Sequence, residues 1–214
     1  MTLVSNMRRI DLNGHILASI DFETTGTQPG YHEICEIGIL PVGDDLETTF
    51  KPFHCYLRPD FPERASSTAM LVNQLDMQTL LDFGLPQEYA KDRFRDWFDR
   101  LNLSAGKKLV PLAHKCEFES AFLDSWLGTS GKYAYFRADA RDAYKFAIMI
   151  NDLAAARGEK PPIKSYSLTK LCNQFGIPFS GEHRALNDAK FEIDVYRHLC
   201  ELANHQGSSG ERSE

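Results

Sequence analysis

The sequence predicts an α/β fold in which a mixed β-sheet is covered by helices. The first half of the chain contains apolar, strand-like segments joined by turn residues, and the second half alternates helix-like with strand-like segments. Hairpin strands followed by alternating elements favour a mixed sheet with helices packed on it. The chain has 214 residues, of which 43% are apolar, so it is long enough to bury such a core without disulfides or structural metals.

The strands are expected in the following order. Residues 15–22 and 33–40 are apolar runs, and residues 50–57 form a third strand-like segment. The residues at 41–45, PVGDD, are typical of a turn, so the second and third segments are expected to pair as a hairpin. A fourth, short apolar strand is expected at 108–113.

Apolar residues at helical spacing predict the helices. Segment 62–103 is expected to be largely helical, and its clearest part is 88–101. Ser167 is expected to cap a short helix that ends at Gly176. The remaining helices are expected at 117–127, 141–157 and 185–203.

One domain is expected over residues 14–203. Residues 1–13 are expected to form an N-terminal extension. Residues 204–214, NHQGSSGERSE, are polar and rich in Gly and Ser, which predicts a disordered C-terminal tail.

Charge and cysteine content exclude several classes of protein. The net charge of −6 excludes a polycation that coats nucleic acid or membranes by charge alone. The five cysteines are scattered and form no Cys-x-x-Cys pair, which indicates reduced, mostly buried thiols in a cytosol. The chain shows neither a signal peptide nor an apolar run long enough to span a membrane, so a cytoplasmic protein without a membrane partner is expected.

Two carboxylates lie together at the end of the first strand, in segment 21–26, DFETTG. Residues i and i+2 of a strand face the same side, so Asp21 and Glu23 project together while Phe22 points into the opposite layer. Adjacent carboxylates repel one another unless a cation lies between them. Hard oxygen ligands suit Mg²⁺ or Mn²⁺. The alternative is a solvated strand end with two unrelated acids.

Another acid lies on the apolar stripe of the last helix. Asp188 falls one turn before Phe191, in line with apolar residues that continue to Leu202. Because carboxylates are rarely buried unless paired or coordinating, Asp188 is a candidate ligand of a metal shared with Asp21. The alternative is a first-turn acid favoured by the helix dipole. His183, five residues before Asp188, is a candidate general base.

A third acidic position follows the strand at 108–113. Glu119 shares a helical face with Phe122 and Trp126, whereas Glu117 points elsewhere and is expected to be solvated or to help the helix start. Glu119 is therefore favoured as the functional acid, with Glu117 as the alternative. His114, where the strand ends, is expected to orient the site and is a candidate substrate-binding residue, not a catalytic one.

Three motifs together resemble the DEDDh subgroup of the DEDD, or DnaQ-like, 3′–5′ exonucleases. They are DFETTG at 21–26, HKCEFE at 114–119 and HRALND at 183–188. The resemblance covers roughly residues 14–203. It implies a ribonuclease-H-like fold, with a five-stranded mixed β-sheet flanked by α-helices.

The resemblance also implies an active site. In this family two divalent ions, Mg²⁺ or Mn²⁺, are held by four carboxylates, and His183 would take a proton from the attacking water. The four carboxylates would be Asp21, Glu23, Glu119 and Asp188. The terminal nucleotide would be contacted by the Phe22 backbone, Thr24 and Thr25.

One motif departs from the family pattern. The central motif usually reads His-Asn-x-x-Phe-Asp, but here Glu119 stands where Asp is usual and Lys115 where Asn is common. A Glu side chain is one methylene longer than Asp and still reaches a metal or its bound water. Activity is therefore expected, and the coordination of the second ion is the feature that this change puts in question.

The predicted function is a 3′–5′ exonuclease that releases 5′-mononucleotides from single-stranded DNA or RNA by a two-metal-ion mechanism. A proofreading role is expected to require a separate polymerase or other protein as partner. Two other classes stay open: a non-catalytic nucleic-acid-binding or polymerase-docking module of the same fold, and an unrelated metal-dependent hydrolase of small phosphate esters. The basic loop 157–170 with Tyr166 is a candidate strand contact, and a solvated loop is the alternative.

Overall fold

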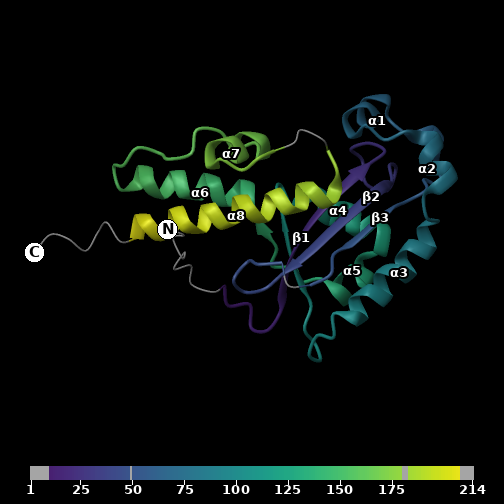
Figure 1. The fold of residues 1–214 in the computed structure, drawn as a ribbon, viewed down its shortest axis with the longest axis horizontal. Helices are drawn as coiled ribbons and strands as arrows, with labels where there is room; N and C mark the ends of the chain where they lie inside the picture. The colour runs from purple at the N-terminus through teal and green to yellow at the C-terminus, as the bar shows by residue number, and fades with distance from the viewer. Residues whose placement is uncertain (1–9, 49, 180–182, 208–214) are drawn as a thin grey trace, which may run out of the picture.

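The computed structural model describes residues 10–48, 50–179 and 183–207, which form a five-stranded mixed sheet with helices on both faces (Figure 1). The strand order is β3-β2-β1-β4-β5. The first three strands pair antiparallel, β4 pairs in parallel with β1, and β5 pairs in parallel with β4. The strands are β1 (Ile16–Thr24), β2 (Ile34–Val42), β3 (Phe53–Tyr56), β4 (Leu109–Ala113) and β5 (Arg141–Asp142). The predicted α/β class with a five-stranded mixed sheet is confirmed.

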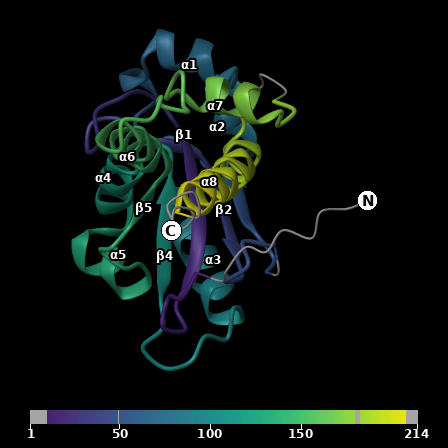
Figure 2. The same ribbon diagram turned by 90° about the vertical axis from the view of Figure 1, so that its left-hand side faces the viewer.

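Helices cover the sheet in two layers (Figure 2). One layer contains α3 (Gln87–Arg100), α4 (Glu117–Leu127) and α5 (Thr129–Tyr135), and the other contains α6 (Ala143–Ala156), α7 (Leu168–Phe175) and α8 (Ala185–Gly207). Two short helices, α1 (Ser67–Asn73) and α2 (Met77–Phe83), follow the 3-10 turn at Pro62–Arg64. No helix in the described part of the chain is both long and apolar enough to cross a membrane.

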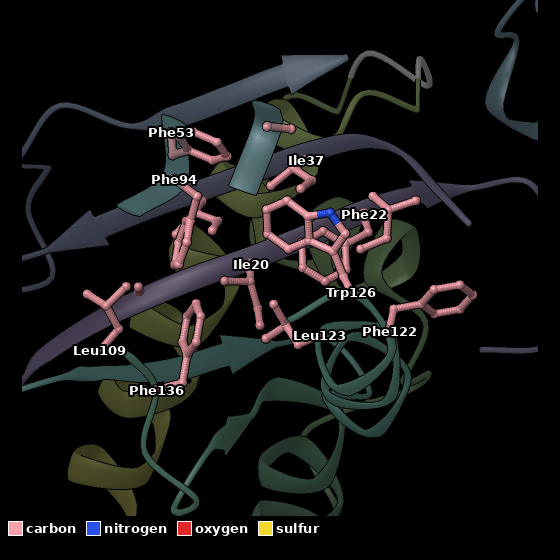
Figure 3. Close-up of a cluster of buried hydrophobic side chains, with 14 of the residues drawn as sticks. Ile20, Phe22, Ile37, Phe53, Phe94, Leu109, Phe122, Leu123, Trp126 and Phe136 are labelled. Carbon is pink, nitrogen blue, oxygen red and sulfur yellow. The ribbon is translucent and has the colours of Figure 1, made fainter. Parts of the chain in front are cut away.

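A large aromatic core fills the layer between the sheet and α3 to α5 (Figure 3). Phe22 and Ile20 of β1 enter this core, where Phe94 of α3 stacks on Phe136 with ring centroids 5.8 Å apart. Phe22 lies in this core, on the face of the sheet covered by α3 to α5, which confirms that it points away from the side of the strand that carries Asp21 and Glu23. Apolar contact on this face therefore fixes the orientation of the acidic residues of β1.

The second core lies under α8, which packs across β1 and β2. The close approach occurs at Gly38 of β2. A Cβ atom added there would lie 2.4 Å from the backbone carbon of Ala185 and 2.5 Å from the backbone nitrogen of Leu186. Only a glycine permits this distance, and it brings the start of α8 directly onto the sheet.

Several element boundaries differ from the sequence predictions. The long helical segment predicted at 62–103 is divided into separate helices, and α5 was not predicted. Residues 141–142 form β5 instead of the first turn of a helix, because they extend the sheet beside β4. Asp142 then caps α6 by accepting a hydrogen bond from the Lys145 backbone N–H. Ser167 precedes α7 as predicted, but its side chain makes no cap hydrogen bond.

The ends of the domain also differ from the predicted bounds of 14–203. Ile10 and Leu12 pack against the second core, and the Ile10 N–H donates to the Asp44 carbonyl. At the other end α8 continues to Gly207, so residues 204–207 are helical and not part of a disordered tail. The rest of the predicted extension and tail, 1–9 and 208–214, lies outside the described residues. All five cysteines are free and four are buried, as predicted.

Candidate active site

The structure brings the predicted acids of β1 and α8 together. Asp21 pairs with Gly38 across the sheet, and Glu23 pairs with Glu36, so the β1 acids lie beside the point where α8 begins. Asp188, in the first turn of α8, is only 5% exposed and faces inward as predicted. The strand alternation of β1 and the helical periodicity of α8 therefore converge on one place.

Of the two candidate acids on α4, Glu119 is the one that reaches the site. It is 5% exposed, and burial raises its pKa, with a further contribution from the charge of Asp21. The Glu117 side chain is 82% exposed, and Lys145 lowers its pKa by a hydrogen bond and by charge. The geometry thus favours Glu119 and leaves Glu117 as a surface residue.

Two further buried acids were missed by the sequence reasoning. Glu36 of β2 is 1% exposed, and its Oε1 forms a hydrogen bond with His54 Nε2 at 2.8 Å. Glu192 of α8 is also 1% exposed. Both had a signal in the sequence: Glu36 interrupts an apolar strand, and Glu192 lies one helical turn after Asp188. We call the six residues together the acid cluster: Asp21, Glu23, Glu36, Glu119, Asp188 and Glu192.

Burial, with repulsion between neighbouring carboxylates, raises the pKa of several acids in the cluster. Burial raises the pKa of Glu23 to about 8, with further contributions from the charges of Asp188 and Glu36, while Arg184 opposes them. Burial also raises the pKa of Asp21 well above its ordinary range, and neighbouring carboxylates add to the effect. In the absence of cations, ionisation of the whole cluster is thus electrostatically costly.

Unsatisfied oxygens within the acid cluster fit a bound cation. Among the described residues, Glu36 Oε2, Glu119 Oε2 and Asp188 Oδ1 are buried and have no hydrogen-bond partner. Buried polar atoms usually have a partner, and carboxylate oxygens suit divalent cations. Glu23, His183 and Asp188 each also offer a ligand atom within 4.8 Å of the others. Asp21 and Glu119 are not members of that compact group of three.

His183 lies at the solvent edge of the acid cluster. Its Nδ1 is 3.2 Å from Asp188 Oδ2, and 44% of its side chain is exposed. The neighbouring Arg184 donates to the backbone carbonyls of Asn73 and His183, so it ties α1 to the segment before α8. The predicted general base is therefore adjacent to an acid and open to a ligand.

The ring of His114 does not face the solvent. Both ring nitrogens are shielded from solvent and make no well-formed hydrogen bond within the described chain. Burial lowers the pKa of His114 to about 4, so the ring is neutral near pH 7. Its ring packs edge-on against Tyr144, with centroids 5.7 Å apart.

The predicted substrate-binding residues of the first motif hold the loop after β1. Thr24 Oγ1 donates to the Gly26 carbonyl, and Thr25 Oγ1 accepts from the Glu33 N–H. Both threonines are buried, and the Thr24 carbonyl accepts from Asn73 of α1. The threonine side chains thus shape the end of β1.

The basic loop predicted to contact a strand is partly engaged within the domain. Arg157 pairs with Glu159, and Tyr166 accepts a hydrogen bond from Asn151 at 2.8 Å. The Tyr166 ring also lies near Tyr144, with centroids 5.9 Å apart. Tyr166 therefore packs within the domain, against the same Tyr144 ring that contacts His114.

A family model described as an exonuclease (RNase_T) matches residues 18–196. This chain belongs to that exonuclease family. The match spans the segment from β1 into α8, and with it the three motifs described above. The DEDD-type 3′–5′ exonuclease resemblance and the ribonuclease-H-like fold are thereby confirmed.

Two curated proteins resemble the chain over most of its length. It is 22% identical over 191 residues to the 3′-5′ DNA exonuclease Cap18 of Escherichia coli, covering 88% of this chain and 93% of Cap18. It is 25% identical over 191 residues to a PolC-type DNA polymerase III of Thermotoga petrophila. The match covers 88% of this chain but spans only 12% of that polymerase.

Solved structures of exonucleases share the fold. E. coli exonuclease I in complex with a dT13 oligonucleotide superposes with a TM-score of 0.68 at 17% identity, covering 91% of this chain and 43% of exonuclease I. A 3′-exonuclease that recognises the histone mRNA stem-loop gives a TM-score of 0.65 at 18% identity, covering 93% of this chain and 68% of that protein.

Proposed function

We propose that this chain is a 3′–5′ exonuclease that releases 5′-mononucleotides from single-stranded 3′ ends. The observation that carries the proposal is the acid cluster at the end of β1, which contains buried carboxylate oxygens without partners beside the exposed His183. A purely structural cluster would be expected to satisfy these oxygens with protein donors.

The donor set fits two divalent cations, Mg²⁺ or Mn²⁺. Asp21, Glu23, Glu119 and Asp188 would hold them. When bound, such ions activate water as a nucleophile and stabilise the charge that develops on the phosphate and on the leaving oxygen. The four carboxylates match the charge of two divalent ions, which would offset the repulsion between these acids.

His183 is proposed as the general base. In the tautomer in which Nδ1 donates to Asp188, Nε2 carries the free lone pair. Asp188 thus orients the ring, and Nε2 takes the proton from the attacking water. The partial exposure of His183 lets the proton pass on to solvent.

The relatives favour the end of a nucleic acid strand as the substrate. Cap18 is named as a 3′-5′ DNA exonuclease, whereas one structural neighbour recognises an mRNA stem-loop. Both DNA and RNA are therefore candidate substrates. The terminal nucleotide is proposed to meet the segment 22–25, and His114, whose ring nitrogens are shielded from solvent, is proposed to orient the site. The likeness to PolC-type polymerases favours a polymerase as partner.

The test is hydrolysis of 5′-labelled single-stranded DNA and RNA in Mn²⁺, Mg²⁺ or EDTA. We expect a metal-dependent ladder of products that shorten from the 3′ end. The rates on DNA and RNA then show which of the two polymers is the better substrate. Asp21→Ala is expected to abolish the ladder. His183→Ala is expected to lower the rate by about 10²–10⁴-fold, which is the usual contribution of general base catalysis.

Glu117→Gln is a matched control for Glu119→Gln. Both variants remove one carboxylate from the first turn of α4, but only Glu119 belongs to the acid cluster. We expect loss of hydrolysis in Glu119→Gln and wild-type rates in Glu117→Gln. A folded protein that binds single strands but does not cut them in Mn²⁺ would overturn the proposal in favour of a docking module.

A further inference from the structure

Glu192 differs from the other members of the acid cluster in how its oxygens are used. Its Oε2 accepts a hydrogen bond from Ser19 Oγ of β1, and its Oε1 accepts one from the His114 backbone N–H, both at 2.7 Å. Glu119 and Asp188 each have a buried oxygen with no partner among the described residues, whereas both oxygens of Glu192 are satisfied by protein donors. Glu192 therefore acts as a structural link between protein segments and has no oxygen left without a protein donor, unlike Glu119 and Asp188.

The link joins three segments that carry candidate ligands. Ser19 lies on β1 two residues before Asp21, and Glu192 lies on α8 one turn after Asp188. His114 follows β4 and begins the turn that leads into α4 and Glu119. A single buried carboxylate therefore fixes the spacing of all three segments.

The turn from His114 to Cys116 depends on side-chain acceptors. The backbone N–H groups of Lys115 and Cys116 donate to the Asp142 carboxylate at 3.4 and 3.1 Å. Lys115 has a φ of 71°, a conformation unusual for a residue with a side chain. The turn is thus held by two carboxylates, Asp142 and Glu192.

No side-chain cap fixes the start of α4, whose N-cap residue is Cys116. The turn at 114–116 therefore leads the chain into α4 and towards Glu119. Of the two carboxylates that hold this turn, only Glu192 also contacts β1, through Ser19. Glu192 is thus the carboxylate that connects the turn before Glu119 to the strand that carries Asp21.

We propose that Glu192 is a positioning residue that places Glu119 against the acids of β1 and α8 and thereby sets the affinity of the site for divalent cations. This inference rests on the proposed function for the assignment of the ligands. Groups that orient metal ligands typically change metal affinity by about 10–100-fold when they are replaced.

The substitution Glu192→Met tests the link with little change of side-chain length, because a thioether is only a weak acceptor and cannot replace the two carboxylate oxygens. Glu192→Gln is the control for charge: its amide oxygen can still accept from the His114 N–H, and its NH₂ group can donate to the Ser19 hydroxyl, so both contacts are kept while the charge is lost. Ser19→Ala removes only the contact with β1, and Glu201→Gln is a control on the same helix that lies outside the acid cluster.

The experiment is calorimetric titration of Mn²⁺ into the metal-free full-length protein. We expect Glu192→Met to weaken Mn²⁺ binding by about tenfold or more, Glu192→Gln and Ser19→Ala to weaken it less, and Glu201→Gln to leave it unchanged. For cleavage of a labelled oligonucleotide, kcat is expected to fall at fixed Mn²⁺, while KM for the oligonucleotide changes less than about twofold.

Circular dichroism and Tm show whether each variant is folded. A folded Glu192→Met whose Mn²⁺ affinity is no weaker than that of Glu192→Gln would overturn the inference. If that variant does not fold, Ser19→Ala decides, because it keeps the carboxylate and removes one contact. A wild-type chain that binds Mn²⁺ without cleaving nucleic acid would refute the proposed function while the affinity comparison still tests Glu192. A wild-type chain that does not bind Mn²⁺ would refute both.

Discussion

Replacing Glu23 by Gln is expected to stabilise the metal-free protein and at the same time to abolish its hydrolytic activity. Glu23 is 7% exposed, and burial, together with the charges of neighbouring carboxylates, raises its pKa from an ordinary value of 4.5 to about 8. The folded state therefore binds this proton more tightly than the unfolded state. The stability that this group contributes is fully present below pH 4.5 and is lost as the pH rises towards 8.

The size of the effect follows from the two pKa values. One pKa unit corresponds to 1.36 kcal/mol, so the change from 4.5 to about 8 sets an upper limit of about 5 kcal/mol. Because the other acids share the repulsion and relax when one charge is removed, we expect a gain of about 2 kcal/mol at pH 8 for Glu23→Gln. In a chain of this size that gain raises Tm by about 4–8 °C.

Scanning calorimetry in EDTA at pH 8 and pH 5 measures this gain. Glu63→Gln is the control, since its side chain is 70% exposed and a surface substitution changes stability by less than about 0.5 kcal/mol. The advantage of Glu23→Gln should shrink at pH 5, where the wild-type carboxyl is protonated. A Tm at pH 8 no higher than that of the wild type, or an equal gain at both pH values, would refute the electrostatic reasoning.

Three further predictions concern cation binding, packing and thiol chemistry. Mn²⁺ should raise the Tm of the wild type more at pH 8 than at pH 5.5, because protons compete for the same carboxylates; equal shifts would contradict this. Gly38→Ala should cost about 1–3 kcal/mol in denaturant unfolding and reduce hydrolysis, since the added Cβ meets the Ala185 backbone, whereas Gly131→Ala on α5 should change little. Thiol labelling of the native protein at pH 8 should be slow, because burial raises the pKa of Cys55 to about 12 and of Cys200 to about 11. Labelling should become fast in denaturant, and rapid labelling before unfolding would contradict the prediction.

Local patterns were sufficient to predict much of the fold. Alternation along β1 placed Asp21 and Glu23 opposite Phe22, and helical periodicity turned Asp188 and Glu119 inward. Such inferences succeed because side-chain direction depends on backbone geometry that repeats every two or 3.6 residues. Short elements were missed for the same reason: β5 has two residues, too few to show a period, and exists because β4 lies beside it.

The sequence by itself determined the class of fold, the three motifs and the orientation of their acids. Only the tertiary structure decided which other groups complete the cluster. Glu36 joins it through its register with Glu23, and Glu192 through hydrogen bonds to residues 173 and 78 positions away in the chain. Strand register and long-range hydrogen bonds depend on how distant segments pack, and the close contact of α8 with Gly38 fixes that packing. A local pattern contains no information about such distances.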